Sequence, residues 1–318
     1  MAKLDVVCFG EILWDIYEEP RSRVAGESIG SAFRRVLGGA PANVAVGLAR
    51  LGVKSAVVGG VGRDAFGESL NALLVREGVD TRTLLRYPNR TGLTFITRDA
   101  RGEPRFLFYR DRTADMALRA SDMTPAMGNA RWVLFGTSTL LDESLREATL
   151  ELVSIARARS ASVVVDLNVR AHLWRSKIDM KHYIKELLQH ADLIKASRDD
   201  LSAVGGLGWL ERAAPGATLL LTAAGEPAQA IGAHGDVQVA AARARCVDAT
   251  GAGDAFLAGA LATLLEHEAR PGSATWQSPH VFVRALKVGH ILGRKAISKV
   301  GAVTGLVNLD GALRGMRR

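Results

Sequence analysis

Short apolar segments alternate with segments of helical pattern along this chain, and the alternation constrains its fold more than any other feature. Strands are predicted at 6–10, 56–62, 132–135, 163–167, 193–195 and 218–222, with a hairpin at 228–231 and 237–241. Helices are predicted at 40–52, 68–77, 142–158, 181–190, after Ser197, after Gly251 and at 280–299. Such alternation builds a mostly parallel sheet with helices on both faces, so we predict one α/β domain over residues 1–318.

Two stretches depart from this alternation. Residues 91–97 and 105–110 have an extended pattern and are separated by the turn signal Asp99–Gly102, without a following helix. Residues 16–37 are mixed in composition and show little periodicity. We expect these stretches to form a small separate β-sheet, a lid built from about 16–37 and 88–113.

The composition is that of a globular protein, with 48% hydrophobic and 23% charged residues. No apolar run is long enough to cross a membrane and no signal peptide is visible, so no membrane partner and a cytoplasmic location are expected. Cys8 and Cys246 both stand in apolar, strand-like context, which predicts two buried thiols rather than a disulfide. The net charge of +8 is scattered, which gives no support to nucleic-acid binding but suits a polyanionic substrate such as a nucleotide.

The chemistry is concentrated in the stretch from Cys246 to Phe256, which precedes an apolar helix. Asp248 and Thr250 are typical N-cap residues, while Gly251 and Gly253 allow a tight turn close to a ligand. The free N–H groups of the helix N-terminus favour an anion. A carboxylate within such a turn suits a base that deprotonates a hydroxyl attacking phosphate, and this is our interpretation of Asp254. The alternative is a favourable first-turn acid on a capped helix.

A second glycine pair opens an earlier helix. Gly38, Gly39 and Pro41 start the helix, and Asn43 lies in its first turns, where it faces whatever the glycines approach. Asp15 follows the first strand, at the edge where parallel sheets bind ligands. Taken alone, Asp15 is more often a surface turn acid than a ligand, and without the glycine pair a solvated first-turn residue would be the preferred interpretation of Asn43.

Other polar residues follow later strands. Asn168, Arg170 and Ser197 stand at strand ends or helix starts, and their types suit phosphate oxygens. The sequence has no GxxxxGK[ST] loop, no Rossmann glycine motif after the first strand, and no zinc-type His or Cys spacing. These observations favour phosphoryl transfer without a classical nucleotide-binding loop.

At this point a family resemblance is evident. The segments Gly38–Gly52 and Asp248–Phe256 resemble the two signature motifs of the ribokinase-like, PfkB carbohydrate kinases, and the resemblance covers nearly the whole chain. It implies a three-layer α/β/α fold with a central mostly parallel sheet and a small β lid that closes over a sugar. It also implies transfer of the γ-phosphoryl of Mg²⁺-bound ATP to a sugar hydroxyl.

The resemblance also implies roles for individual residues. Asp254 would be the base, with Gly251, Ala252 and Gly253 as the anion hole, while Asp15, Gly39 and Asn43 would hold the sugar. The residues implied at the nucleotide are Asn168, Arg170, Ser197, Thr222, Gly225 and His290. Asp200 would bind magnesium through a water molecule, and Asp248 and Thr250 would bind a monovalent cation such as K⁺. A homodimer through the lid strands is a further expectation.

Several local strings resemble fructokinases, among them Phe108–Met116, Asp166–Arg170 and Ile194–Ser197. The 2-keto-3-deoxygluconate kinases share Arg110 and the Asn168-x-Arg170 pattern, and are the alternative; a ribokinase, a nucleoside kinase and a catalytically silent sugar-binding relative rank below them. Arg110 would meet a substrate carboxylate or a sugar hydroxyl. Three residues depart from the family pattern: Ala249 for Thr, Asp200 for Glu, and Ala224 for Gly.

Overall fold

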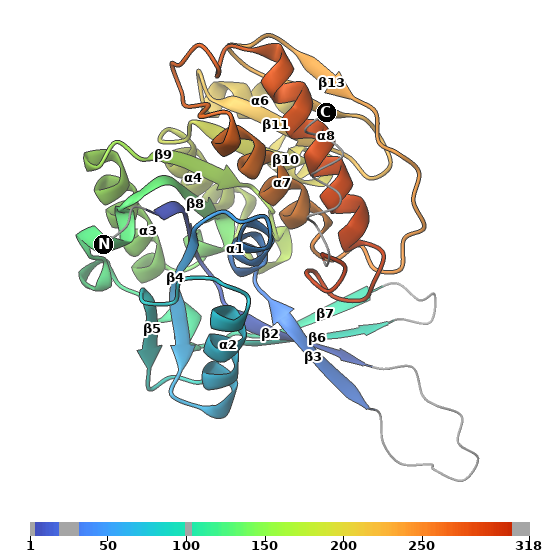
Figure 1. The fold of residues 1–318 in the computed structure, drawn as a ribbon. Coiled ribbons are helices and arrows are strands. Elements are labelled where there is room, and N and C mark those ends of the chain that lie inside the picture. Colours follow the sequence, from blue (N-terminus) through green and yellow to red (C-terminus); the bar gives the residue numbers. More distant parts are fainter. Residues whose placement is uncertain (1–3, 19–31, 99–103, 307–318) are drawn as a thin grey trace.

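A nine-stranded sheet forms the centre of the computed structural model, which describes residues 4–18, 32–98 and 104–306 (Figure 1). Its strands, in spatial order, are β13 (Val237–Val239), β12 (Ala228–Ile231), β11 (Thr218–Thr222), β10 (Leu193–Ser197), β9 (Ser162–Asp166), β8 (Ala130–Gly136), β1 (Leu4–Phe9), β4 (Ser55–Gly62) and β5 (Leu84–Tyr87). Neighbours from β11 to β5 pair in parallel, and only the β12–β13 end is antiparallel. The predicted sheet is confirmed, and β5 is a strand that the sequence pattern did not reveal.

Helices cover both faces of this sheet. One face carries α1 (Ala40–Arg50), α2 (Ala65–Arg76), α7 (Ala252–Glu266) and α8 (Pro279–Ala296). The other carries α3 (Glu143–Ala158), α4 (Lys177–Leu188), α5 (Arg198–Val204) and α6 (Leu207–Ala213). The fold is therefore the three-layer α/β/α arrangement that the family resemblance implied.

The central strands are apolar because both of their faces are buried. All eight residues of β4 are buried, as are residues 6–9 of β1. Parallel strands of this kind give near-continuous apolar runs, which is why they were visible in the sequence. Since β1, β8, β9 and β10 run in parallel, their carboxyl ends meet at one edge of the sheet, where open α/β sheets bind their ligands.

A second, four-stranded sheet projects from this edge (Figure 1). Its order is β3 (Phe33–Gly38), β2 (Leu13–Glu18), β6 (Leu93–Arg98) and β7 (Pro104–Tyr109). The β6–β7 pair was predicted, although its turn at Asp99–Gly102 lies outside the described residues, as does 19–31 of the predicted lid segment. Residues 16–18 belong to β2 and residues 33–37 to β3, so this segment contributes to the small separate sheet as expected, although its sequence shows little periodicity. The first three residues of β3 are all exposed, so its sequence shows no alternation.

Small residues bring α1 against α7. A Cβ on Gly47 would lie 2.8 Å from the Cβ of Ala258, so only a glycine permits this approach of the two helices. One turn earlier on each helix, Asn43 faces Asp254, and their side chains are hydrogen bonded. Close helix packing thus sets the relative position of two residues that are 211 positions apart in the chain.

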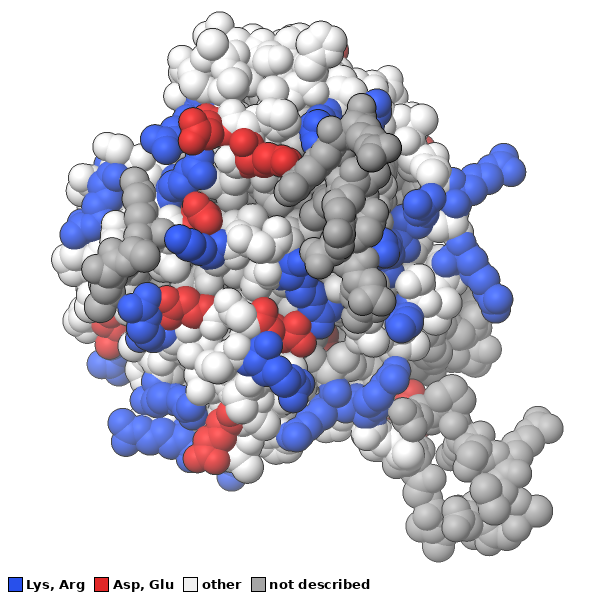
Figure 2. Space-filling view, viewed as in Figure 1, with Lys and Arg blue, Asp and Glu red and all other residues white. Residues whose placement is uncertain are grey.

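The surface corrects one prediction. Cys8 is buried, but Cys246 is exposed, because residues 240–248 form an irregular loop rather than a strand. On the face shown in Figure 2, Asp and Glu lie among Lys and Arg on the left and in the centre, whereas the right-hand side shows mainly Lys and Arg. Among the described helices, none has the length and apolar character needed to cross a membrane.

Candidate functional site

The turn before α7 is shaped by Gly251. This residue is the N-cap of the helix and has a φ of +76°, in the left-handed region. A Cβ there would lie 2.3 Å from the Cβ of Ala302, so both conformation and space require glycine. Ala252 donates its N–H to the Ala249 carbonyl at 3.2 Å, whereas no partner among the described residues accepts from the N–H of Gly253 or Asp254. The turn therefore presents free donors at the positive end of a helix.

Asp248 and Thr250 do not cap this helix as predicted. Asp248 instead accepts hydrogen bonds from the Thr250 amide at 3.1 Å, the Thr250 hydroxyl at 2.8 Å and the Gly301 amide at 2.8 Å. Burial favours a higher pKa for Asp248, but these hydrogen bonds outweigh it and the pKa is lowered. The carboxylate thus holds the loop before the helix and the segment after α8 together.

Asp254 lies in the first turn of α7 and is 8% exposed. Its Oδ2 accepts a hydrogen bond from Asn43 Nδ2 at 2.8 Å. The Oδ1 atom of Asn43 is buried without a hydrogen-bond partner among the described residues. Because a buried amide oxygen seeks a donor, this atom is suited to a hydroxyl placed beside the Asp254 carboxylate.

Burial and neighbouring charges bring the pKa of Asp254 closer to neutral pH. Burial raises its pKa to about 6, assisted by the negative charge of Asp166 and opposed by Asn43, Lys195 and Arg170. A base works best when its pKa lies near the operating pH. The carboxylate is therefore ionised at pH 7 but only weakly stabilised in that form, so it accepts a proton readily.

Asp15 approaches Asp254 from the second sheet. The structure places it inside β2, opposite Val36 and Thr94, and not in a turn after the first strand as predicted. Burial and the nearby Asp254 charge raise its pKa to about 8, with Arg170 opposing. The Asp15 carboxyl is therefore mainly protonated at pH 7, where Asp254 is mainly ionised.

Glycines make room for these carboxyl groups. A Cβ on Gly38 would lie 2.6 Å from Asp15 Oδ1, and a Cβ on Gly39 would lie 2.2 Å from the Glu11 carbonyl. Gly39 has a φ of +96° and is the N-cap of α1, and its carbonyl accepts from the Asn43 amide at 2.9 Å. The glycine pair thus allows the Asp15 side chain and the Glu11 backbone to lie close against the start of α1.

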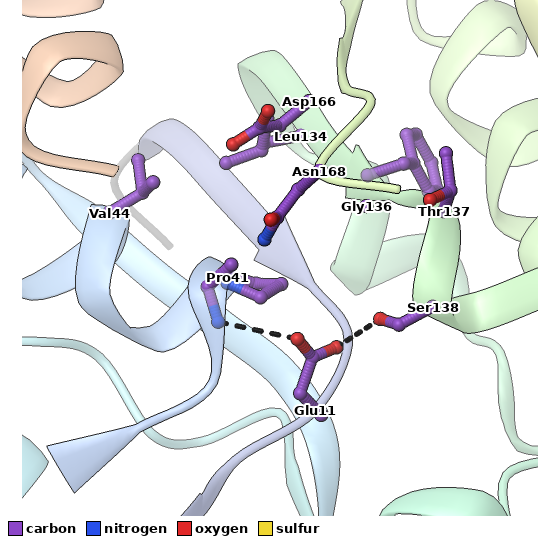
Figure 3. A pocket seen from close by; sticks show the side chains of 11 residues that line it. Glu11, Pro41, Val44, Leu134, Gly136, Thr137, Ser138, Asp166 and Asn168 are labelled. Atoms are coloured by element: carbon purple, nitrogen blue, oxygen red, sulfur yellow. Dashed lines mark hydrogen bonds between the residues drawn. The ribbon is translucent and has the colours of Figure 1, made fainter. Parts of the chain in front are cut away.

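A pocket lies beside this cluster at the carboxyl edge of the main sheet (Figure 3). Glu11, between β1 and β2, accepts from the Ala40 amide at 3.3 Å and from the Ser138 hydroxyl. Asn168 points into the space between Glu11 and Asp166. Glu11 and Ser138 were not singled out from the sequence, although both follow predicted strands, the same signal that identified Asn168.

The segment after β9 is held by a capping box. Ser197 is the N-cap of α5, and its hydroxyl and amide both donate to Asp200 Oδ2 at 2.7 Å. Asp200 Oδ1 accepts from the Val169 amide at 2.6 Å, which positions the flanking Asn168 and Arg170. Asn168 has a φ of +31°, an uncommon conformation that such an anchor helps to maintain. The predicted cap at Ser197 is confirmed, and Asp200 serves first to fix this loop.

Arg110 is already paired. Its Nε donates to Asp115 Oδ2 at 2.7 Å, and the two side chains are 10% and 0% exposed, respectively. Asp115 also accepts from the Thr113 hydroxyl at 2.6 Å. The guanidinium is therefore neutralised within the protein, and a substrate carboxylate would have to compete with Asp115.

Three residues predicted near the nucleotide lie further along the sheet. Thr222 ends β11, and Gly225 has a φ of +71° in a turn with no atom within 4 Å of an added Cβ. His290 Nε2 lies 3.3 Å from the amide nitrogen of Ala228 in β12 and 3.1 Å from the carbonyl oxygen of Val239, the last residue of β13. Burial lowers the His290 pKa, which keeps the ring neutral at pH 7. This histidine joins α8 to the sheet edge, and the structure does not bring it to Asp254.

Lys195 is a charged residue of this region that we did not single out from the sequence. It lies in β10, is 5% exposed, and its Nζ is 3.1 Å from Asp166 Oδ1. Burial opposes its charge, but the carboxylates of Asp166, Asp200 and Asp254 outweigh burial and raise the pKa, so the ammonium is charged. A lysine within the apolar strand Leu193–Ser197 was the available signal.

The residues present fit a metal that arrives with a nucleotide rather than a resident one. Within the parts of the chain that the structure describes, no group of three or more His, Cys, Asp or Glu residues is arranged to hold a metal ion. Magnesium in phosphoryl-transfer sites is held largely by substrate phosphates and water, with one or two carboxylates. Asp200 has one free acceptor position, on Oδ1, which suits a metal-bound water and not direct ligation.

Comparison with known proteins agrees with this geometry. The model of the pfkB family of carbohydrate kinases matches residues 3–308. The chain is 34% identical to Fructokinase-1 from Zea mays over 95% of this chain and 94% of that protein, and 35% identical to Fructokinase-2 from Solanum lycopersicum over 83% and 85%. Among solved structures, a fructokinase with bound ATP from Xylella fastidiosa superposes with a TM-score of 0.86 and 28% identity over 99% of both chains. An aminoimidazole riboside kinase from Salmonella enterica gives 0.81 and 26% over 98% and 99%.

Proposed function

The chain belongs to the pfkB family of carbohydrate kinases, and we propose that it transfers the γ-phosphoryl of ATP to a hydroxyl of fructose, with Asp254 as the base. The observation that carries this proposal is the Asn43–Asp254 hydrogen bond of 2.8 Å, which joins the amide turn of α7 to the glycine-flanked start of α1. A proton acceptor and free main-chain donors thereby share one place. This is the arrangement that phosphoryl transfer to an alcohol requires.

Each residue of the pair has a defined task in the proposed reaction. The free Oδ1 of Asn43 accepts from a sugar hydroxyl and orients it. Asp254 takes the proton of the attacking hydroxyl, for which a pKa of about 6 is suitable. The free amides of Gly253 and Asp254, rather than the predicted amide of Ala252, which already donates to Ala249, stabilise charge that develops on the phosphoryl oxygens. Magnesium, bound with the nucleotide, supplies neutralisation of phosphate charge.

The charges around Asn43 and Asp254, where the sugar is placed, favour a neutral substrate over a sugar acid. Glu11, Asp15 and Asp254 gather acidic groups there, and the charge of Arg110 is matched by Asp115. A ligand carboxylate would lie near Glu11 and the ionised Asp254, whose negative charges disfavour it and are offset only in part by Arg170. Fructose carries no charge, whereas 2-keto-3-deoxygluconate carries one. We therefore place fructose ahead of the acid, which Arg110 would have to leave Asp115 to bind.

A coupled assay of ADP formation tests this proposal. Fructose, 2-keto-3-deoxygluconate, ribose and adenosine are compared at equal concentrations with Mg²⁺ and ATP. We expect the highest kcat/KM with fructose. Turnover with the sugar acid alone would replace fructose by the alternative substrate, and sugar binding without turnover of any member would indicate a catalytically silent relative.

We include a homodimer through the second sheet in the proposal. Four large apolar side chains on β3 and β7 are exposed: Phe33 at 50%, Phe106 at 37%, Leu107 at 53% and Tyr109 at 61%. Both strands are edge strands, which favour pairing with another chain. Sedimentation equilibrium tests this element, with a monomer at micromolar concentration as the contrary result.

The monovalent cation and the compartment remain part of the proposal. Asp248 is ionised and lies in the loop that leads to Gly251, so a cation such as K⁺ bound there would act on the amide turn. Replacing K⁺ by tetramethylammonium in the assay tests this, with unchanged turnover as the contrary result. Free thiols at Cys8 and Cys246 are consistent with the cytoplasm, which fractionation of the source cells would examine.

A further inference from the structure

The ammonium of Lys195 lies directly against the amide turn of α7. A Cβ added to Gly253 would be 2.6 Å from Lys195 Nζ and 3.3 Å from its Cε. Gly253 thus leaves the space that the end of the lysine side chain occupies. Lys195 reaches this point from β10, three strands away from β1 in the sheet order.

Lys195 and the start of α7 bring positive charge together in one place, where a further anion would be stabilised. The N-terminus of α7 carries a partial positive charge, and Lys195 adds a full charge beside it. Arg170 also contributes positive potential, since it lowers the pKa of Asp254. Asp166 offsets part of this charge at 3.1 Å, but neither of its oxygens has an aligned hydrogen bond among the described residues.

Stability alone gives no reason for the Lys195–Asp166 pair. A buried ion pair is on average no more stabilising than apolar residues of similar volume, because removing both charges from water is costly. Lys195 is flanked in β10 by the buried Ile194 and Ala196, so an apolar residue would fit the strand. A cation placed beside free amide donors instead matches a multiply charged anion.

We propose that Lys195 is a further catalytic residue, whose ammonium binds an oxygen of the transferring γ-phosphoryl group, and that Asp166 is a positioning residue that holds it there. The assignment rests on the proposed function. In the step, the sugar oxygen forms a bond to the γ-phosphorus and its proton passes to Asp254. The bond from the γ-phosphorus to the bridging oxygen breaks, and ADP leaves with the electron pair. Lys195 offsets charge on the phosphoryl oxygens throughout and transfers no proton.

The test removes the cation without leaving a buried unpaired carboxylate. The double variant Lys195→Met with Asp166→Asn serves this purpose, and Lys195→Gln with Asp166→Asn offers a second neutral pair should the first fail to fold. Asp166→Asn alone keeps the cation. Lys181→Met, on α4 beside Trp209, is the matched control for loss of one lysine outside the site.

We expect each folded double variant to lose roughly 100- to 1000-fold in kcat, the cost of removing one donor to the transition state, with little change in KM for the sugar. Affinity for a non-hydrolysable ATP analogue falls roughly ten- to a hundredfold, while affinity for ADP, which lacks the γ-phosphoryl, is unchanged. A purely structural pair would change ADP and ATP-analogue binding equally. Double variants with kcat within a few-fold of wild type would overturn the assignment.

Two further measurements distinguish a failure of this inference from a failure of the proposed function. If Asp254→Asn abolishes turnover while the folded double variants remain active, Lys195 is not catalytic and the proposed function stands. If Asp254→Asn remains fully active, the proposed function itself fails. A crystal structure of the unmodified protein with ADP and aluminium fluoride needs no variant: we expect Lys195 Nζ to contact a fluoride, and contact with Asp166 alone would overturn the inference.

Discussion

Replacing Asn43 by Ala should move the acid limb of the pH–rate profile upward. Asn43 donates to the Asp254 carboxylate at 2.8 Å and thereby favours its ionised form. A hydrogen bond to a charged group contributes about 1.5–3 kcal/mol, and one pKa unit corresponds to about 1.4 kcal/mol. Loss of this bond therefore raises the Asp254 pKa from about 6 by roughly one to two pH units.

The direction in which the acid limb shifts follows from the proposed role of Asp254 as a base. A base is active only when ionised, so kcat/KM for the wild type rises with pH through about 6 and is nearly complete at pH 7. In the variant, the same rise occurs at higher pH, and activity at pH 7 falls more than activity at pH 8.5. The pH dependence of kcat/KM is the correct readout, since it reports the free enzyme.

The assay is initial-rate ADP formation at subsaturating fructose between pH 5 and 9, with coupling enzymes in excess at every pH. Asn71→Ala is the matched control, because Asn71 lies on α2 and contributes nothing to the site. The size of the rate loss is not diagnostic, since Asn43 also faces the sugar. An acid limb at the same pH in Asn43→Ala and wild type would refute the electrostatic account of this pair.

Three further predictions concern other contacts. Gly253→Ala should lower kcat by roughly ten- to a hundredfold, because the new methyl group displaces Lys195 Nζ. The melting temperature should hardly change, because only the end of a flexible side chain moves. An unchanged kcat would contradict this prediction. In the native protein, only Cys246 should react with a thiol reagent within minutes, and a second equivalent from Cys8 would indicate an opened core. Asp64→Ala should reduce the free energy of unfolding at pH 7 by about 1 kcal/mol, through loss of the α2 cap. Hydrogen bonds from Thr91 and Gly67 outweigh burial and lower the Asp64 pKa. The stability difference between the wild type and Asp64→Ala should therefore shrink as the pH falls below about 4 toward the lowered pKa. An equal loss of stability at pH 7 and pH 3 in urea titrations would contradict this.

The parts of the fold that were predictable from sequence are those where burial and chain chemistry act locally. The central strands are buried on both faces and give continuous apolar runs, as in β4. Ser197 and Asp200 form a capping box within four residues, so the pattern contains the whole interaction. Gly39 and Gly251 each have a positive φ at a helix N-cap, which explains why glycines preceded both predicted helices.

Features that depend on distant parts of the chain were not predictable in this way. Asp15 was predicted to follow a strand, but it belongs to β2, which pairs with β3 and with the distant strand β6. Cys246 stands in an apolar string that forms an exposed loop, because its neighbours find no strand to pair with. Single-residue patterns give no information about such pairings.

The candidate site shows the same division. Asp254 and Asn43 were found because each follows a glycine-rich helix start, yet their hydrogen bond depends on the contact between Gly47 and Ala258. Lys195 and Glu11 were overlooked because a single charged residue in or after a strand is indistinguishable from an exposed one. The importance of Lys195 comes from its burial beside Asp166 and that of Glu11 from its contact with Ser138, and only the assembled structure reveals these neighbours.

Turnover by Asp254→Asn is the most direct test of the central claim that this carboxylate accepts the proton of the attacking sugar hydroxyl. The asparagine is nearly the same size, and circular dichroism and sugar binding verify that the variant is folded. We expect kcat for fructose phosphorylation to fall by roughly 10²–10⁴-fold with fructose affinity retained. A folded variant that phosphorylates fructose at the wild-type rate would contradict the account.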